Sequence, residues 1–184
     1  MHQVTIGNWS MEIQVGDRPL HFDGLVERSR LADDLDLTSG PGRTLFLAVY
    51  GPGNSKLETS EPTVALAMRY EPYDFGFYPG FLIVPETSML FVGAGTRLIA
   101  YDLNAPTRLW TDEANCGFWR WGRNRDHIWM EAELEFAVWS SAGEKLWTTF
   151  VEPPWFAQVN GEEVVLDVMG VKRTHRMTDG KEIR

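Results

Sequence analysis

The sequence predicts an all-β protein, and three observations support this prediction. Short apolar segments with the period-two alternation of strands recur along the 184 residues, separated by turns rich in Gly, Pro and Asn. Between Met89 and Phe150 a series of strand-like segments ending in Leu-Trp occurs twice. The first copy ends at Leu109-Trp110, the second ends 37 residues later at Leu146-Trp147, and a fainter third ends at Ile183-Arg184. Repeats of about 40 residues made of short strands are typical of propeller blades.

The N-terminal half is expected to be rich in strands, although it does not align to the repeat. Residues 2–15 alternate loosely and predict strands, which end at the turn Gly16–Pro19. The apolar run Thr44–Tyr50 predicts a buried strand, and Thr63–Tyr70 alternates as another. The segment between them is ambiguous. Asp23 is a suitable cap for a helix with Val26, Leu31 and Leu35 on its inner face, but a non-helical segment fits equally well.

The C-terminal half, residues 86–184, is expected to hold three propeller-like repeats of antiparallel strands. Five segments are predicted to be strands: Leu90–Gly93, Arg97–Asp102, Ile128–Ala132, Leu134–Ser140 and Val164–Val168. Trp110 and Trp147 are expected to be mostly buried in the wedge between twisted sheets. Three blades are too few to close a ring. Residues 1–85 therefore form a diverged β region that completes the ring, or the ring is incomplete, or the sheets form a β-sandwich. We find no linker, so residues 1–184 are predicted to be a single domain.

The first copy resembles the quinoprotein-like (PQQ-type) propeller repeat. That repeat has an Ala-x-Asp motif, a Thr-Gly-Lys-like turn and a Trp that docks on the neighbouring blade, and Ala100, Asp102 and Trp110 match it. Ala105 and Pro106 replace the usual Thr and Gly of the turn. The second copy keeps Gly143 and Trp147 but has Ser140 in place of the Asp, and the third keeps Asp179-Gly180-Lys181 and ends in Arg184. The resemblance implies blade architecture for about half of the chain. It implies no cofactor and no catalytic residue.

Composition limits the possible partners and location. The net charge of −9 argues against binding nucleic acid, which requires clustered Lys and Arg, and fits a basic protein partner. The longest apolar runs are far too short to cross a bilayer. A single cysteine, Cys116, excludes an internal disulfide, and Met1–Ile6 lacks the pattern of a secretory signal. Both observations favour the cytoplasm.

The segment Phe118–Arg125 is the first candidate binding site. It combines Trp119 and Trp121 with Arg120 and Arg123, and Trp and Arg are the residue types that dominate binding hot spots. Tryptophan faces also bind sugars. The alternative is that Trp119 and Trp121, at alternate positions of a strand, are packing residues.

The second candidate is a row of carboxylates. Glu131, Glu133 and Glu135 alternate with apolar residues, so on a single strand they would share one face, about 7 Å apart. Such a row suits a basic partner, a pair of acid and base residues for glycoside hydrolysis, or a hard cation. The alternative is a solvated strand face with no binding role.

No catalytic or metal motif is evident. The four histidines lack zinc-ligand spacing, and neither a nucleophile elbow nor a phosphate-binding loop is present. The sequence therefore predicts a binding protein without enzymatic activity, an acidic module that binds or inhibits another macromolecule, as an immunity-type protein does. The alternative function is a carbohydrate-binding protein or glycoside hydrolase that uses the Trp and Glu residues named above.

Overall fold

The computed structural model describes residues 2–35, 42–52, 61–71 and 78–183, which form four β-sheets and one helix. Three of the sheets are four-stranded antiparallel meanders, each built from consecutive strands of the chain. In the second sheet these strands are β6 (Gly80–Val84), β7 (Met89–Ala94), β8 (Arg97–Asp102) and β9 (Thr107–Glu113). In the third sheet they are β10 (Phe118–Asn124), β11 (His127–Ala132), β12 (Glu135–Ser140) and β13 (Lys145–Phe150). The fourth sheet consists of β14 (Trp155–Asn160), β15 (Glu163–Val168), β16 (Val171–Arg176) and β17 (Glu182–Ile183).

The first sheet differs from this pattern. Its five strands have the order β1-β2-β4-β5-β3, with β3 parallel to β5 and all other pairs antiparallel. The strands are β1 (His2–Ile6), β2 (Trp9–Val15), β3 (Leu31–Leu35), β4 (Arg43–Tyr50) and β5 (Val64–Tyr70), and the helix α1 (Phe22–Arg28) lies between β2 and β3 in the chain. A parallel neighbour requires a crossover. The segment containing α1 supplies it.

Alternation along the strands places core residues on both faces of the inner sheets. In β7, Leu90 and Val92 join the core shared with the first sheet, whereas Phe91 joins the core shared with the third sheet. Likewise Trp139 of β12 faces the second sheet and Val138 faces the fourth. Because successive strand side chains point to opposite faces, a continuous apolar strand is what a doubly covered sheet requires.

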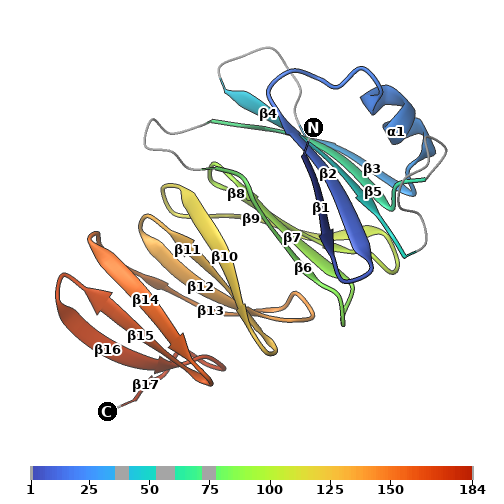
Figure 1. Cartoon of the computed structure of the whole chain (residues 1–184). Coiled ribbons are helices and arrows are strands. Elements are labelled where there is room, and N and C mark those ends of the chain that lie inside the picture. Colours follow the sequence, from blue (N-terminus) through green and yellow to red (C-terminus); the bar gives the residue numbers. More distant parts are fainter. Residues whose placement is uncertain (1, 36–41, 53–60, 72–77, 184) are drawn as a thin grey trace.

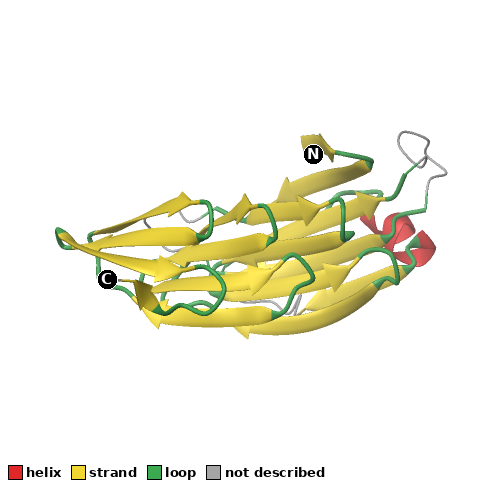
Figure 2. Cartoon of the chain, turned by 90° about the horizontal axis from the view of Figure 1, so that it is seen from below, coloured by secondary structure: helices red, strands yellow, loops and turns green. Residues whose placement is uncertain are grey.

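The four sheets follow one another in an open row (Figure 1). The helix α1 covers the outer face of the first sheet, where Phe22 packs edge-on against Phe46 with ring centroids 4.9 Å apart. Figure 2 shows this helix at the end of the row opposite the C-terminus. The first and fourth sheets lie at opposite ends of the row, so the arrangement is the incomplete ring rather than a closed one or a two-sheet sandwich.

Most of the expected elements are present. The five strands predicted for the repeats are confirmed to within one residue at their ends. The segment that the sequence left ambiguous is divided: Phe22–Arg28 is helical, whereas Leu31–Leu35 is a strand because it pairs with Val64–Met68 of β5. Trp110 and Trp147 are mostly, though not fully, buried and pack against the two cores that flank the third sheet, which agrees with the expectation. Arg184, the expected end of the third repeat, lies outside the described residues.

Among the described residues, no helix has the length and apolar character needed to cross a bilayer.

Candidate functional site

Each repeat is joined to the next by a tryptophan that lies on a glycine turn. The indole N–H of Trp110, on β9, donates to the carbonyl of Gly143 in the third sheet at 2.6 Å. The indole N–H of Trp147, on β13, donates to the carbonyl of Met177 in the fourth sheet at 2.7 Å. A Cβ atom at Gly180 would lie 2.7 Å from the Trp147 ring, so only glycine fits there without a shift. These contacts give the Trp and Gly of the repeat a physical role in docking adjacent sheets.

The tryptophans of the first candidate site also serve packing. Trp119 is stacked on Trp155 with centroids 5.4 Å apart and an interplanar angle of 13°, within the core between the third and fourth sheets. Trp121 lies in the core between the second and third sheets, with its ring centroid 5.4 Å from that of Trp139. The two rings do not share a face, as simple alternation would require, because a β-bulge between Phe118 and Arg120 inserts an extra residue. The structure therefore supports the packing alternative for both rings.

Arg120 and Arg123 of this segment are engaged in ion pairs. Nη2 of Arg120 lies 2.7 Å from Oε1 of Glu131 on the neighbouring strand, and Nη1 of Arg123 lies 3.0 Å from Oε2 of Glu86. The Arg120 side chain is nevertheless 62% exposed. A contact role for Arg120 and Arg123 stays a prediction.

The predicted carboxylate row is not formed on one strand. Glu131 lies on β11 and Glu135 on β12, and Glu133 lies in the turn between these strands. Glu131 is buried and accepts hydrogen bonds from the Trp129 indole and from Arg120. Glu135 is buried as well and accepts from the Asn115 backbone N–H at 2.9 Å and the Thr148 hydroxyl at 2.6 Å. Both carboxylates thus satisfy the hydrogen-bonding requirement of a buried charge from within the chain. A binding role for the three residues stays a prediction.

The described part of the chain holds no group of three or more His, Cys, Asp or Glu residues placed to bind a metal ion. Cys116 is exposed and is the only cysteine in the sequence.

A cleft of about 370 Å³ with a largely apolar lining lies between the third and fourth sheets, and we call it the C-terminal cleft. Its floor includes the buried Val151 and Leu166. Its rim carries three apolar side chains that are largely exposed: Phe150 at 64%, Met169 at 64% and Val171 at 59%. Thr149, Glu152, Val168, Arg173 and His175 complete the lining. Exposed apolar side chains gathered around one cleft are typical of an interaction surface.

Unpaired strand edges border this cleft. β13, which contributes Thr149 and Phe150, is the edge strand of the third sheet. In the fourth sheet, β17 pairs with Thr174 and His175 of β16 but does not reach Val171. Within the described residues, one edge of β13 and the first half of β16 therefore leave backbone N–H and C=O groups without a partner strand. Such edges can take up an additional strand from another chain.

The β15–β16 hairpin at the rim of the C-terminal cleft has an unusual turn. Met169 and Gly170 connect β15 to β16 and have φ of 54° and 86°. Two-residue turns with positive φ at both positions favour Asn-Gly or Asp-Gly, because a side chain such as that of Met is strained there. The sequence signal for this site is therefore an apolar residue before Gly170 in a hairpin turn, which our reading of the sequence missed.

Comparison with known proteins identifies no family for this chain. No family model matches the sequence, and no curated protein is similar to it. Among solved structures, the computationally designed Ika8 protein is 12% identical, with a TM-score of 0.48, over 99% of this chain and 59% of that chain. BamB from Moraxella catarrhalis is 14% identical, with a TM-score of 0.44, over 87% of this chain and 51% of BamB. A europium-containing methanol dehydrogenase is also 14% identical, with a TM-score of 0.42, over 59% of this chain and 24% of that enzyme.

The chain thus spans about half the length of BamB and somewhat more of Ika8. Its own sheets establish an all-β architecture in which three of the four sheets are four-stranded antiparallel blades, in agreement with the resemblance of the C-terminal half to the PQQ-type repeat.

Proposed function

We propose that this chain is a binding module for another protein and that the C-terminal cleft receives an apolar side chain of that partner. The observation that carries the proposal is the grouping of the exposed Phe150, Met169 and Val171 around one cleft with an apolar floor. Burying such side chains contributes about 25 cal/mol per Å² of apolar area removed from water. An apolar anchor entering a preformed cleft is the usual centre of a protein interface.

The partner segment is extended. The cleft lies beside the unpaired edges of β13 and of Val171–Arg173. A strand that pairs with such an edge presents every second side chain to the same face. One of those side chains would occupy the cleft.

The partner is also basic, because the net charge of −9 attracts cationic proteins over long range. Masking a basic partner, as an inhibitor or immunity-type protein does, is the role that fits such a module. The buried and internally paired Glu131 and Glu135 are not required for this attraction, since it arises from the whole charge distribution.

A peptide library displayed on phage tests the proposal, with the full chain as bait. We expect enriched peptides to combine an aromatic or aliphatic residue with Lys or Arg. Their binding should fall at least tenfold for Met169→Asn, which removes the apolar side chain while suiting the positive φ of the turn. Val171→Thr should also weaken it. Leu20→Asn, at a fully exposed apolar residue outside the cleft, is the matched control. Equal binding by all four proteins would contradict the proposal, as would the absence of any enriched peptide.

A further inference from the structure

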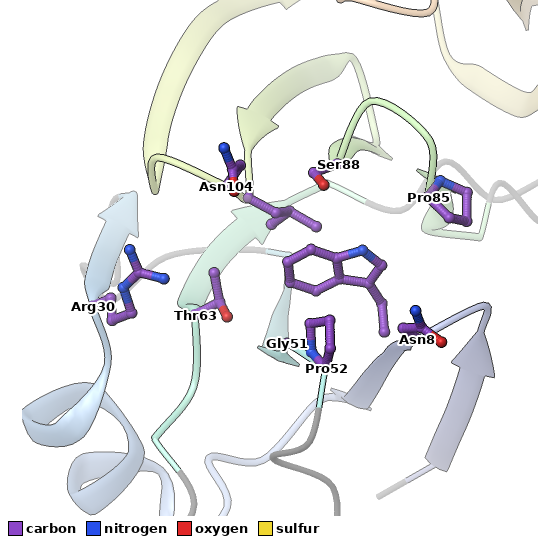
Figure 3. Close-up of a pocket in the computed structure, with 10 residues that line it drawn as sticks. Asn8, Arg30, Gly51, Pro52, Thr63, Pro85, Ser88 and Asn104 are labelled. Atoms are coloured by element: carbon purple, nitrogen blue, oxygen red, sulfur yellow. The ribbon is translucent and has the colours of Figure 1, made fainter.

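A second cleft, of about 410 Å³, lies between the first and second sheets. Six chain segments converge on it: the β1–β2 turn, the residues that precede β3, the residues that precede β5, the end of β4, the β6–β7 turn and the β8–β9 turn. Figure 3 shows Arg30 and Thr63 on one side, Asn8 on the other, and Ser88 and Asn104 on the edge formed by the second sheet. We call it the N-terminal cleft.

The walls of the N-terminal cleft are held by backbone hydrogen bonds. The Thr63 N–H donates to the Val49 carbonyl at 2.6 Å, and the Arg30 N–H donates to the Pro62 carbonyl at 2.9 Å. On the opposite side, the Leu103 N–H donates to the Ser88 carbonyl at 2.8 Å. The lining groups are therefore preorganised, which lowers the entropic cost of binding a ligand.

Polar side chains in this cleft have no partners among the residues that the structure describes. Asn8, Arg30, Thr63, Ser88 and Asn104 line it, and within the described ranges none of their side chains makes a hydrogen bond or ion pair. Thr63 is only 4% exposed, so its hydroxyl has little access to bulk water except through the cleft. Asn8, Arg30 and Asn104 are exposed, so their polar groups are open to solvent and available to a ligand in the cleft.

The charge in the cleft is positive although the protein as a whole is acidic. Arg30 is the only charged residue among the described residues that line the cleft, and its guanidinium offers five donors and no acceptor. The nearest carboxylate in sequence to Asn104, that of Asp102, accepts the backbone N–H groups of Asn104 and Ala105. Asp33, near the start of β3, accepts the hydroxyl of Tyr101 and pairs with Arg108. Neither carboxylate lines the cleft or neutralises Arg30.

The remaining lining is apolar and compact. Trp9 is 6% exposed, and its ring lies 3.4 Å from the position that a Cβ atom of Gly51 would take. Leu103, Pro52 and Pro85 complete this part of the wall. A cleft of this size and mixed lining is typical of a small-molecule site.

From this combination we infer that the N-terminal cleft binds a small organic anion, in which a carboxylate or phosphate meets Arg30 and a compact apolar body lies against Trp9 and Leu103. Arg forms paired hydrogen bonds with both kinds of oxyanion. Asn8, Thr63, Ser88 and Asn104 supply further hydrogen bonds. The inference is independent of the protein partner proposed above, because residues of the third and fourth sheets line that partner's cleft and these sheets lie toward the other end of the row (Figure 1).

The test is a titration of the ¹⁵N-labelled full chain, followed by amide chemical shifts. The probes are benzoate, phenyl phosphate and benzamide, which is an uncharged analogue of benzoate. We expect at least one of the two anions, and benzamide much more weakly, to shift the amides of residues 8–9, 30–31, 63 and 103–104. Arg30→Gln should weaken binding about ten- to hundred-fold, the range expected for a lost hydrogen bond to a charged group. Arg28→Gln, at an exposed arginine outside the lining, should bind as the wild type does.

The comparison of the two anions separates a carboxylate ligand from a phosphate ligand. No shift with either anion up to 10 mM would overturn the inference. So would equal binding of benzamide and benzoate, or an Arg30→Gln variant that folds, as judged by its own spectrum, and binds as tightly as the wild type.

Discussion

The hydrogen bond from the Trp110 indole to the Gly143 carbonyl joins two successive blades, and in the next pair of blades the Trp147 indole donates to the Met177 carbonyl. Trp147 and Gly180 stand 37 residues after Trp110 and Gly143, and there the indole lies directly over the glycine. The repeat seen in the sequence is therefore a repeat of interfaces between sheets as well as of strands. The Trp and the Gly that meet belong to adjacent blades. Their distance along the sequence therefore sets how one sheet is positioned against the next.

Replacing the docking glycine tests this relationship. Gly180 and Gly161 both have positive φ, 68° and 62°, but a Cβ atom at Gly180 would meet the Trp147 ring at 2.7 Å, whereas at Gly161 it would meet nothing within 4 Å. Both Ala variants should lose about 1–2 kcal/mol of unfolding free energy from backbone strain. Gly180→Ala should lose a further 1–3 kcal/mol or so from overlap. Urea unfolding measures both, and equal losses would show that the indole contact is not tight.

Two Trp→Phe variants isolate the hydrogen bond. The Trp110 N–H has the Gly143 carbonyl as its partner, whereas the buried N–H of Trp121 has none within the described residues. Trp110→Phe should therefore destabilise the protein by about 1 kcal/mol more than Trp121→Phe, since only the former loses a hydrogen bond. The comparison uses urea melts of both variants. A larger loss for Trp121→Phe would contradict it.

The buried carboxylates of Glu131 and Glu135 are expected to stabilise the folded state. Glu131 and Glu135 accept hydrogen bonds from Trp129 and Arg120 and from Asn115 and Thr148, respectively. Glu135→Gln keeps the shape but turns one acceptor into a donor facing existing donors, so it should cost about 1–3 kcal/mol. The exposed Glu144→Gln should be nearly neutral. Thermal or urea unfolding distinguishes them, and a neutral Glu135→Gln would mean that the carboxylate is not needed for folding.

Stability should fall in alkaline solution because of buried tyrosines. Burial raises the pKa of Tyr101 well above its usual value, and the negative charge of Asp33, which accepts its hydroxyl, raises it further. A raised pKa in the folded state means that the unfolded chain ionises first. The stabilisation is complete below the unfolded pKa of about 10 and is lost above it, by about 1.4 kcal/mol per pH unit. Tyr101→Phe should flatten this dependence between pH 9.5 and 11, as measured by urea unfolding. An unchanged slope would contradict the prediction.

The sequence predicted the C-terminal half of the fold well, because alternation and the Trp spacing are local consequences of strand geometry and blade docking. Two local patterns were misleading for physical reasons. The bulge at Trp119 reverses the alternation, so Trp119 and Trp121 enter different cores. The run from Glu131 to Glu135 alternates like one strand but spans a turn, and both of its buried ends find partners on other segments.

Local sequence patterns could not predict the two clefts, because each cleft is formed by segments that are far apart in the sequence. Trp9, Arg30, Thr63 and Leu103 meet only after the first two sheets pack. The crossover through α1 that brings Arg30 beside Thr63 depends on the parallel pairing of β3 with β5, which alternation does not encode. In the C-terminal cleft, Phe150 and Val171 come from different sheets.

The central functional claim is that the C-terminal cleft is the site of protein binding. It is tested most directly by titrating the ¹⁵N-labelled full chain with an enriched library peptide and following the amide shifts. We expect the largest shifts in Thr149–Glu152 and Val168–Arg173, and we expect affinity to fall as salt is raised from 50 to 500 mM because screening weakens the attraction of a basic peptide to a chain of net charge −9. Shifts centred on Trp119–Arg123, with the C-terminal cleft unchanged, would contradict the claim.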